Sequence, residues 1–284
     1  MVRKFSLLNE KGQEYSLMDI NNYCLLTDPS GLGYSYNSEY EQLGNTFINT
    51  IRTIGQGSIS GTLNFLNYDN YRKLIKFMQS SQKLQLEYVV PYVGGEKTFY
   101  RDVELNSISK SQIQPNGIIS ESITLTTLSL WYEKVNTIYT IEDNDNVVRW
   151  DFDFDSYWNG YDVRNLEYTN LGDVEAPIEV IVNGEVINPR LELYIEGELY
   201  QTITISDTIE EYEQLIYNSK ENEFAIKKRL ADGTYESLFS LDYIDFSNDN
   251  VLRIPNDRTC TIKLRADETI TNATLIVYVY YVAV

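Results

Sequence analysis

The sequence has no histidine among its 284 residues and only two cysteines. Without histidine, Ser-His-Asp and Cys-His nucleophilic sites and the common zinc sites with imidazole ligands are excluded. Cys24 and Cys260 lie in opposite halves of the chain, so we expect buried, inert thiols rather than a disulfide within one domain. A carboxylate-pair glycosidase stays open because Asp and Glu number 42, but we expect a protein that is not an enzyme and needs no cofactor.

Long apolar runs and basic clusters are also scarce. The longest apolar stretch, residues 275–284, is about half of the roughly 20 residues that span a bilayer, and it reads as a buried terminal strand. The first residues lack the apolar region of a secretory signal. The basic run Lys227-Lys228-Arg229 is interpreted as a solvated strand or loop edge. We therefore expect a soluble protein that binds neither nucleic acid nor membrane.

Negative charge is abundant, and it is concentrated in the second half of the chain. Residues 1–135 hold 12 Lys and Arg against 13 Asp and Glu, whereas residues 136–284 hold 11 against 29. The net charge of −19 therefore divides into −1 and −18. A single compact domain has no reason to place its excess charge in this way, so we predict two domains, 1–135 and 136–284.

Strand signals dominate the first domain, because Tyr, Val, Ile, Thr and Phe recur there in short alternating runs. The predicted strands cover residues 61–66, 84–90, 103–108 and 123–131. One helix is predicted over residues 68–80, where Tyr71, Leu74, Ile75 and Met78 share a face behind a cap from Asn67 or Asp69. This helix should pack across a sheet.

The second domain shows the same alternation, with turn signals at Asn183-Gly184, Glu196-Gly197 and Asp232-Gly233. Residues 207–222 are acidic, and we expect a loop with a helical turn there. Short, regularly spaced strands of this kind predict a β-sandwich. The predicted strands are 147–154, 178–182, 191–195, 199–205, 223–228, 261–265 and 273–282.

Short motifs of turn residues extend along the whole chain in a recognisable order. The first half carries Gly31-Leu32-Gly33, Gly55-Gln56-Gly57-Ser58-Ile59-Ser60-Gly61, Tyr100-Arg101-Asp102-Val103 and Trp131-Tyr132. The second half carries Asn170-Leu171-Gly172-Asp173, Ala176-Pro177-Ile178, Gly184 and Asn188-Pro189. In these motifs Gly172 and Gly184 permit tight turns, and Asn188-Pro189 closes a hairpin. This order resembles the distal tail protein (Dit) family of long-tailed phages.

The resemblance implies a mainly β fold: an N-terminal tail-tube-like β-sandwich with one helix, which forms a hexameric ring, and a C-terminal galectin-like β-sandwich that projects outward. It implies a structural protein of the virion tail tip or baseplate, assembled in the host bacterial cytoplasm. The implied partners are further copies of itself, the tail-tube protein, a tail-associated lysin or tail-tip protein, and receptor-binding or peripheral baseplate proteins. A near-neutral ring domain and an acidic outward domain suit this plan, because like charges repel within a ring.

Residues 150–162 contain two candidate sites. Asp151, Asp153 and Asp155 match the first positions of a calcium loop, but Ser156 replaces its glycine and Asp162 its bidentate glutamate. Strict alternation favours a strand there, with the aspartates facing water.

The aromatic side chains of the same segment could instead stack on a sugar ring. They are Trp150, Tyr157, Trp158 and Tyr161. A packed turn at the domain entrance is the simpler interpretation. One alternative function is therefore a carbohydrate-binding module for host cell-wall sugars. A second alternative, which follows from the tail-tube-like first domain, is a major tail-tube subunit.

Overall fold

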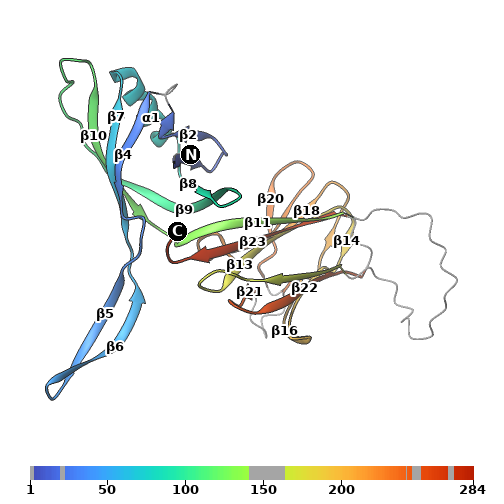
Figure 1. Cartoon of the computed structure of the whole chain (residues 1–284). Helices are drawn as coiled ribbons and strands as arrows, with labels where there is room; N and C mark the ends of the chain where they lie inside the picture. Colours follow the sequence, from blue (N-terminus) through green and yellow to red (C-terminus); the bar gives the residue numbers. More distant parts are fainter. Residues whose placement is uncertain (1–2, 20–22, 141–163, 241, 245–250, 268–271) are drawn as a thin grey trace. The chain divides into compact units, whose positions relative to one another are not determined.

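The structure is a computed structural model, and it describes residues 3–19, 23–140, 164–240, 242–244, 251–267 and 272–284. The chain forms two compact units, Met1–Glu133 with Tyr281–Val284, and Lys134–Tyr280. Antiparallel sheets make up most of both units, and the described part holds one α-helix (Figure 1). The predicted mainly β fold with one helix is confirmed.

Unit 1 consists of short and long antiparallel strands around the helix. Its elements are β1 (Lys4–Asn9), β2 (Glu14–Ser16), β3 (Met18–Asp19), β4 (Cys24–Ser30), β5 (Tyr36–Leu43), β6 (Thr46–Ile54), β7 (Ser58–Phe65), α1 (Tyr68–Gln79), β8 (Leu84–Tyr92), β9 (Gly95–Ile108), β10 (Ile119–Thr127) and the first residues of β11 (Trp131–Thr140).

The main sheet of unit 1 is continuous, in the order β3-β4-β7-β10-β9-β8-β1-β2. Its strands are antiparallel, with Leu63 opposite Glu121 between β7 and β10 and Leu7 opposite Leu86 between β1 and β8. Alternate side chains point into one core; Leu7, Leu63 and Leu86 are fully buried there. Trp131, at the start of β11, is also part of this core.

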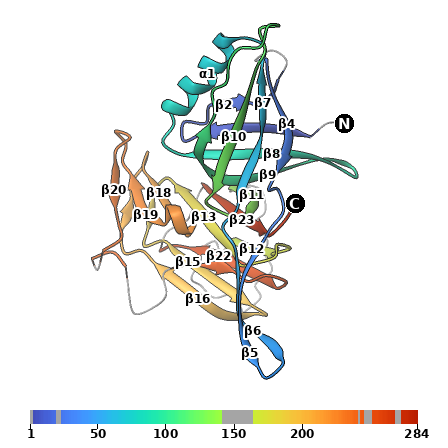
Figure 2. The same ribbon diagram turned by 90° about the vertical axis from the view of Figure 1, so that its left-hand side faces the viewer.

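Helix α1 packs on this sheet as its spacing predicts (Figure 2). Asn67 is the cap, because its side-chain oxygen accepts from the Asn70 amide at 3.0 Å. Tyr71 and Leu74 are buried, and the Tyr71 ring meets the edge of Phe65 at 5.6 Å. The predicted helix over 68–80 is thus confirmed.

Unit 2 consists of two facing antiparallel sheets, which the two views show as layers (Figures 1 and 2). One sheet has the order β20-β19-β18-β13-β23 and the other β12-β22-β15-β16. The elements are β12 (Arg164–Thr169), β13 (Ala176–Asn183), β14 (Val186–Ile187), β15 (Arg190–Ile195), β16 (Glu198–Thr204), β17 (Thr208–Ile209), β18 (Gln214–Asn218), the short 3-10 helix η1 (Glu221–Glu223), β19 (Ala225–Arg229), β20 (Tyr235–Ser237), β21 (Arg253–Ile254), β22 (Thr259–Arg265) and β23 (Asn272–Tyr281).

The core of unit 2 lies where the inward faces of these strands meet. Val180 and Val182 of β13, with Leu191 and Leu193 of β15, are almost completely buried. Gly172 lies beside this core without a positive φ, and a Cβ added there would sit 2.5 Å from the Tyr280 carbonyl oxygen. We predicted that Gly172 permits a tight turn; its hydrogen atom instead lets two backbone segments approach each other.

Two of the predicted segments differ from the structure, and a third is not tested. The predicted strand 123–131 breaks at residues 128–130, because the Ser129 hydroxyl accepts the Asp102 amide and the chain turns there. Residues 207–222 hold β17 and β18 as well as the helical turn, because Leu215 and Tyr217 alternate into the core. The predicted strand 147–154 lies outside the described residues.

The chain end also departs from the predicted division. Residues 281–284 were placed in the second domain, but they group with unit 1. The Tyr281 ring meets the edge of Phe99 at 5.6 Å, and its hydroxyl donates to Glu133 Oε2 at 3.3 Å. These contacts attach the end of β23 to unit 1.

Candidate interaction surfaces

The candidate sugar and metal residues of the sequence analysis lie in a segment that the structure does not describe. They are Trp150, Tyr157, Trp158 and Tyr161 for a sugar, and Asp151, Asp153 and Asp155 for a metal. Within the described ranges, no group of three or more His, Cys, Asp or Glu side chains could hold a metal ion. Both sites stay predictions.

Cys24 and Cys260 are free and buried, and burial raises the pKa of the Cys24 thiol to about 12. The prediction that both thiols are buried is confirmed. Among the residues that the structure describes, no helix is both long and apolar enough to span a membrane.

The hairpin of β5 and β6 is an exposed apolar surface of unit 1 that the sequence patterns did not reveal. Its strands pair only with each other, and Figure 1 shows them extending away from the main sheet. The Gly44-Asn45 turn between two alternating runs was the available signal. Exposed apolar side chains on it are Tyr36, Tyr40, Leu43, Phe47, Ile48 and Ile51.

The outer part of this hairpin, which we call the hairpin tip (residues 39–51), is apolar on both faces. Cross-strand partners face the same side, so the pair Gln42–Phe47 places Tyr40 and Phe47 on one face. Leu43 and Ile48 lie on the other face. Phe47 is 70% exposed and Tyr40 63%. Apolar side chains that are exposed on both faces of a two-stranded ribbon indicate a protein partner. They contribute no hydrophobic stabilisation while they remain in contact with water.

The base of the hairpin is fixed to the core of unit 1. The Trp131 indole Nε1 donates to the Leu32 carbonyl at 3.0 Å, just before β5. After β6, the Gly57 amide donates to the Thr127 hydroxyl at 3.1 Å, and the Gln56 side chain donates to the Thr127 carbonyl at the same distance. The base of the hairpin is therefore held to unit 1 by hydrogen bonds, whereas the hairpin tip is exposed.

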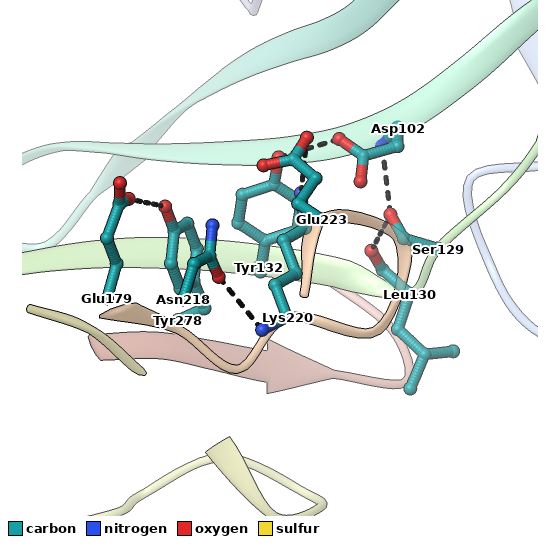
Figure 3. Close-up of polar contacts among 9 residues, drawn as sticks. All are labelled: Asp102, Ser129, Leu130, Tyr132, Glu179, Asn218, Lys220, Glu223 and Tyr278. Atoms are coloured by element: carbon teal, nitrogen blue, oxygen red, sulfur yellow. Dashed lines mark hydrogen bonds and ion pairs between the residues drawn. The ribbon is translucent and has the colours of Figure 1, made fainter. Parts of the chain in front are cut away.

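A polar group in unit 1 holds the break between β10 and β11 (Figure 3). The Tyr132 hydroxyl donates to Asp102 Oδ1 at 2.8 Å, and the Asp102 amide donates to Ser129 Oγ at 2.9 Å. The Ser129 hydroxyl donates to the Leu130 carbonyl at 2.8 Å. These bonds satisfy partly buried polar groups and orient the start of β11, so their role is structural.

A second polar group lies in unit 2, around the buried Lys220 (Figure 3). Its ammonium is 3.9 Å from Glu223 Oε1 and 5.5 Å from the centre of the Tyr278 ring. The Tyr278 hydroxyl donates to Glu179 Oε2 at 2.6 Å, and burial together with this carboxylate raises the pKa of Tyr278 far above its ordinary value. Lys220 is thus compensated by a carboxylate and an aromatic face.

The basic run of the sequence analysis lies on β19, and its central lysine is not solvated as expected. Lys228 is only 13% exposed, and its ammonium lies 2.9 Å from Asp207, 3.8 Å from Glu236 and 4.0 Å from Glu213. Burial alone lowers the pKa of Lys228, but the bond to Asp207 and the three negative charges outweigh it, so the pKa is raised. Lys228 neutralises an acidic cluster within its own unit.

Lys228→Met should lower the free energy of unfolding of unit 2 by about 2 kcal/mol, because it leaves three neighbouring carboxylates without their cation. Urea denaturation followed by circular dichroism measures the change. Arg229→Met, one residue further along and exposed, is the matched control and should change stability by less than about 0.5 kcal/mol. Equal effects of the two substitutions would contradict this role of Lys228.

Comparison with known proteins agrees with this architecture. Residues 4–128 match the family model for the distal tail protein, N-terminal domain. The fold is similar to a chain of the phage P2 baseplate in its activated conformation with Ca, with 17% identity, a TM-score of 0.68 and full coverage of both chains. The structure of that baseplate with Sr matches at 16% identity and a TM-score of 0.69, also over both full chains.

The Dit protein of phage SPP1 has a similar fold, with 10% identity and a TM-score of 0.52 over 96% of this chain and 98% of that one. No curated protein matches the sequence. The resemblance derived from the turn motifs is confirmed: residues 4–128 match the N-terminal domain of the distal tail protein family.

Proposed function

We propose that this protein is a structural component of a phage tail tip or baseplate, and that unit 1 of six copies closes into a ring. The hairpin of β5 and β6 carries this proposal, because its tip exposes apolar side chains on both faces of a ribbon that its own unit leaves uncovered. A surface of this kind that contacts a different surface of the next copy gives a head-to-tail contact, which closes into a ring or continues as a filament.

The similar solved structures support a place in a phage tail. The matched chains come from the phage P2 baseplate, and the SPP1 protein is described as a paradigm of a hub adsorption apparatus in phages that infect Gram-positive bacteria. We propose that the ring joins the tail tube to tail-tip or receptor-binding proteins in the virion. This is a role in assembly, without catalysis.

The charge division fits this proposal. Nearly all the net charge lies in residues 136–284, at −18, so the unit that forms the ring carries little self-repulsion. We propose that unit 2 is a galectin-like β-sandwich that faces outward and holds peripheral components. Its negative surface would favour partners with basic docking surfaces.

The mass of the purified full-length chain tests the proposed ring. Six copies of the 32.9 kDa chain have a mass of 6 × 32.9 = 197.4 kDa, which light scattering separates from a monomer. We expect this mass, together with rings with a central hole in negative-stain images. Long tubes would favour a tail-tube subunit instead, and a monomer at every concentration would contradict self-association.

A further inference from the structure

One sheet of unit 2 ends in an open strand edge. β20 is the first strand in the order β20-β19-β18-β13-β23, and among the residues that the structure describes it pairs only with β19 (Figure 2). All three of its residues are exposed. Such an edge presents main-chain N–H and C=O groups that a further strand can bind.

The main-chain groups at this edge follow from the pairing of β20 with β19. The Leu238 amide, just after β20, donates to the Ile226 carbonyl at 2.9 Å. In an antiparallel pair, the residues that bond the neighbouring strand are two apart, so Glu236 faces β19 as Leu238 does. The N–H and C=O groups of Tyr235 and Ser237 therefore point away from β19, toward the open edge.

The side chains of β19 that share a face with Tyr235 carry positive charge. Arg229 lies opposite Tyr235 in the strand register. Lys227, two residues before Arg229, lies opposite Ser237, so the four side chains point to one side of the sheet. We call these four residues the cationic edge. The Lys227 ammonium lies 4.6 Å from the centre of the Tyr235 ring, and Tyr235 is 60% exposed.

No carboxylate neutralises the cationic edge within the described part of unit 2. Neither Lys227 nor Arg229 forms an ion pair there, and the Arg229 guanidinium donates to the Gln214 side chain at 3.4 Å. The Asp232 carboxylate, in the turn after β19, accepts from the Thr234 amide at 2.8 Å and from its hydroxyl at 2.6 Å. Two cations are thus left without a counter-charge, in a half of the chain whose net charge is −18.

An extended acidic peptide complements both features of this edge. Its main chain can bond Tyr235 and Ser237. Side chains two apart share one face of a strand, so carboxylates at alternate positions would meet both Lys227 and Arg229. A small anion or an anionic glycan would use the two cations but not the main-chain groups.

We propose that β20 binds an extended acidic segment of another tail protein, which adds to the sheet as a further strand with its carboxylates beside Lys227 and Arg229. This contact rests on the proposed role of unit 2 in holding peripheral components, but it does not require the ring. The cationic edge differs in sign from the rest of unit 2, so it selects a partner segment that the remaining surface repels.

Binding of a short labelled peptide, in which glutamate alternates with valine, tests the two cations. Fluorescence anisotropy with the full-length chain measures the dissociation constant. Lys227→Glu with Arg229→Glu should weaken binding about tenfold, because two attractions become repulsions. The matched control, Lys73→Glu with Lys76→Glu, makes the same change of charge at exposed positions of α1 and should leave binding unchanged.

The same peptide, methylated at its backbone amides, tests the addition of a strand. Alternate amides of an added strand face β20, and the others face away from it. Methylating one alternate set should therefore abolish binding, whereas methylating the other set should leave most of it. A surface that only attracts anions would bind both methylated peptides equally.

The outcomes separate this contact from the proposed ring. If the full-length chain has the mass of a ring but does not bind the peptide, or binds it as tightly after Lys227→Glu with Arg229→Glu, the contact is wrong and the ring stands. Equal binding of the two methylated peptides would also overturn it. Binding that needs both cations and one set of amides would establish the contact, even in a chain that stays monomeric.

Discussion

Replacing Phe47 and Ile48 together with serine should weaken the self-association of the full-length chain by about 100-fold. The two side chains lie on opposite faces of the hairpin tip and are 70% and 49% exposed. Burying a Phe or Ile side chain fully contributes about 1.5–3 kcal/mol. If the contact between copies buries each of these two side chains in part, their loss costs about 3 kcal/mol of association free energy per contact. Sedimentation over a range of concentrations measures the dissociation constant.

The same substitutions should leave the free energy of unfolding of the chain almost unchanged, because both side chains are exposed within their own unit. The matched control is Leu199→Ser with Tyr200→Ser, an exposed apolar pair on β16 of unit 2 at 53% and 65%. That pair should not alter self-association. If the two double variants weaken association equally, the effect is general surface hydrophobicity and the hairpin is not the contact.

Trp131→Ala should destabilise unit 1 by about 4 kcal/mol. Trp131 is fully buried, its ring centre is 5.6 Å from that of Tyr88, and the Arg101 guanidinium lies 5.4 Å from it. Removing a buried aromatic side chain leaves a cavity and typically costs 3–5 kcal/mol. Here the cost includes the aromatic face that compensates Arg101, whose pKa burial lowers to about 10.

Denaturation of the full-length chain, followed by circular dichroism, measures this loss as an earlier transition for unit 1 and an unchanged one for unit 2. Leu128→Ala, three residues earlier and 46% exposed, is the control and should change stability by less than about 0.5 kcal/mol. Because Trp131 also holds the Leu32 carbonyl at the hairpin base, its loss should weaken self-association too. A small effect on both would show that the core repacks around the gap.

Much of the β architecture could be predicted because alternation directly reports which side chains face a core. Leu191 and Leu193 alternate with polar residues and are buried, as expected for a half-buried strand. Helix α1 was predicted for the same reason: Tyr71 and Leu74 share a face, and the Asn67 side chain caps the first turn. These patterns are local and need no knowledge of the rest of the chain.

The hairpin of β5 and β6 could not be recognised in this way. Tyr40, Phe47 and Ile51 look like core residues by type, and alternation does not say whether a face meets the chain's own core or a partner. The same limit applies to Lys228, whose three carboxylates come from separate segments of unit 2. Exposure and charge compensation are properties of distant segments that folding brings together.

The sequence by itself determined the mainly β class, the single long helix, the division of charge between the halves and the family resemblance, because each depends on residue types and their local spacing. Only the tertiary structure decided that the hairpin tip lies uncovered, that Lys228 lies against three carboxylates, and that residues 281–284 join unit 1. These features depend on which distant segments meet, and burial and electrostatic energies follow from those contacts rather than from the order of residues.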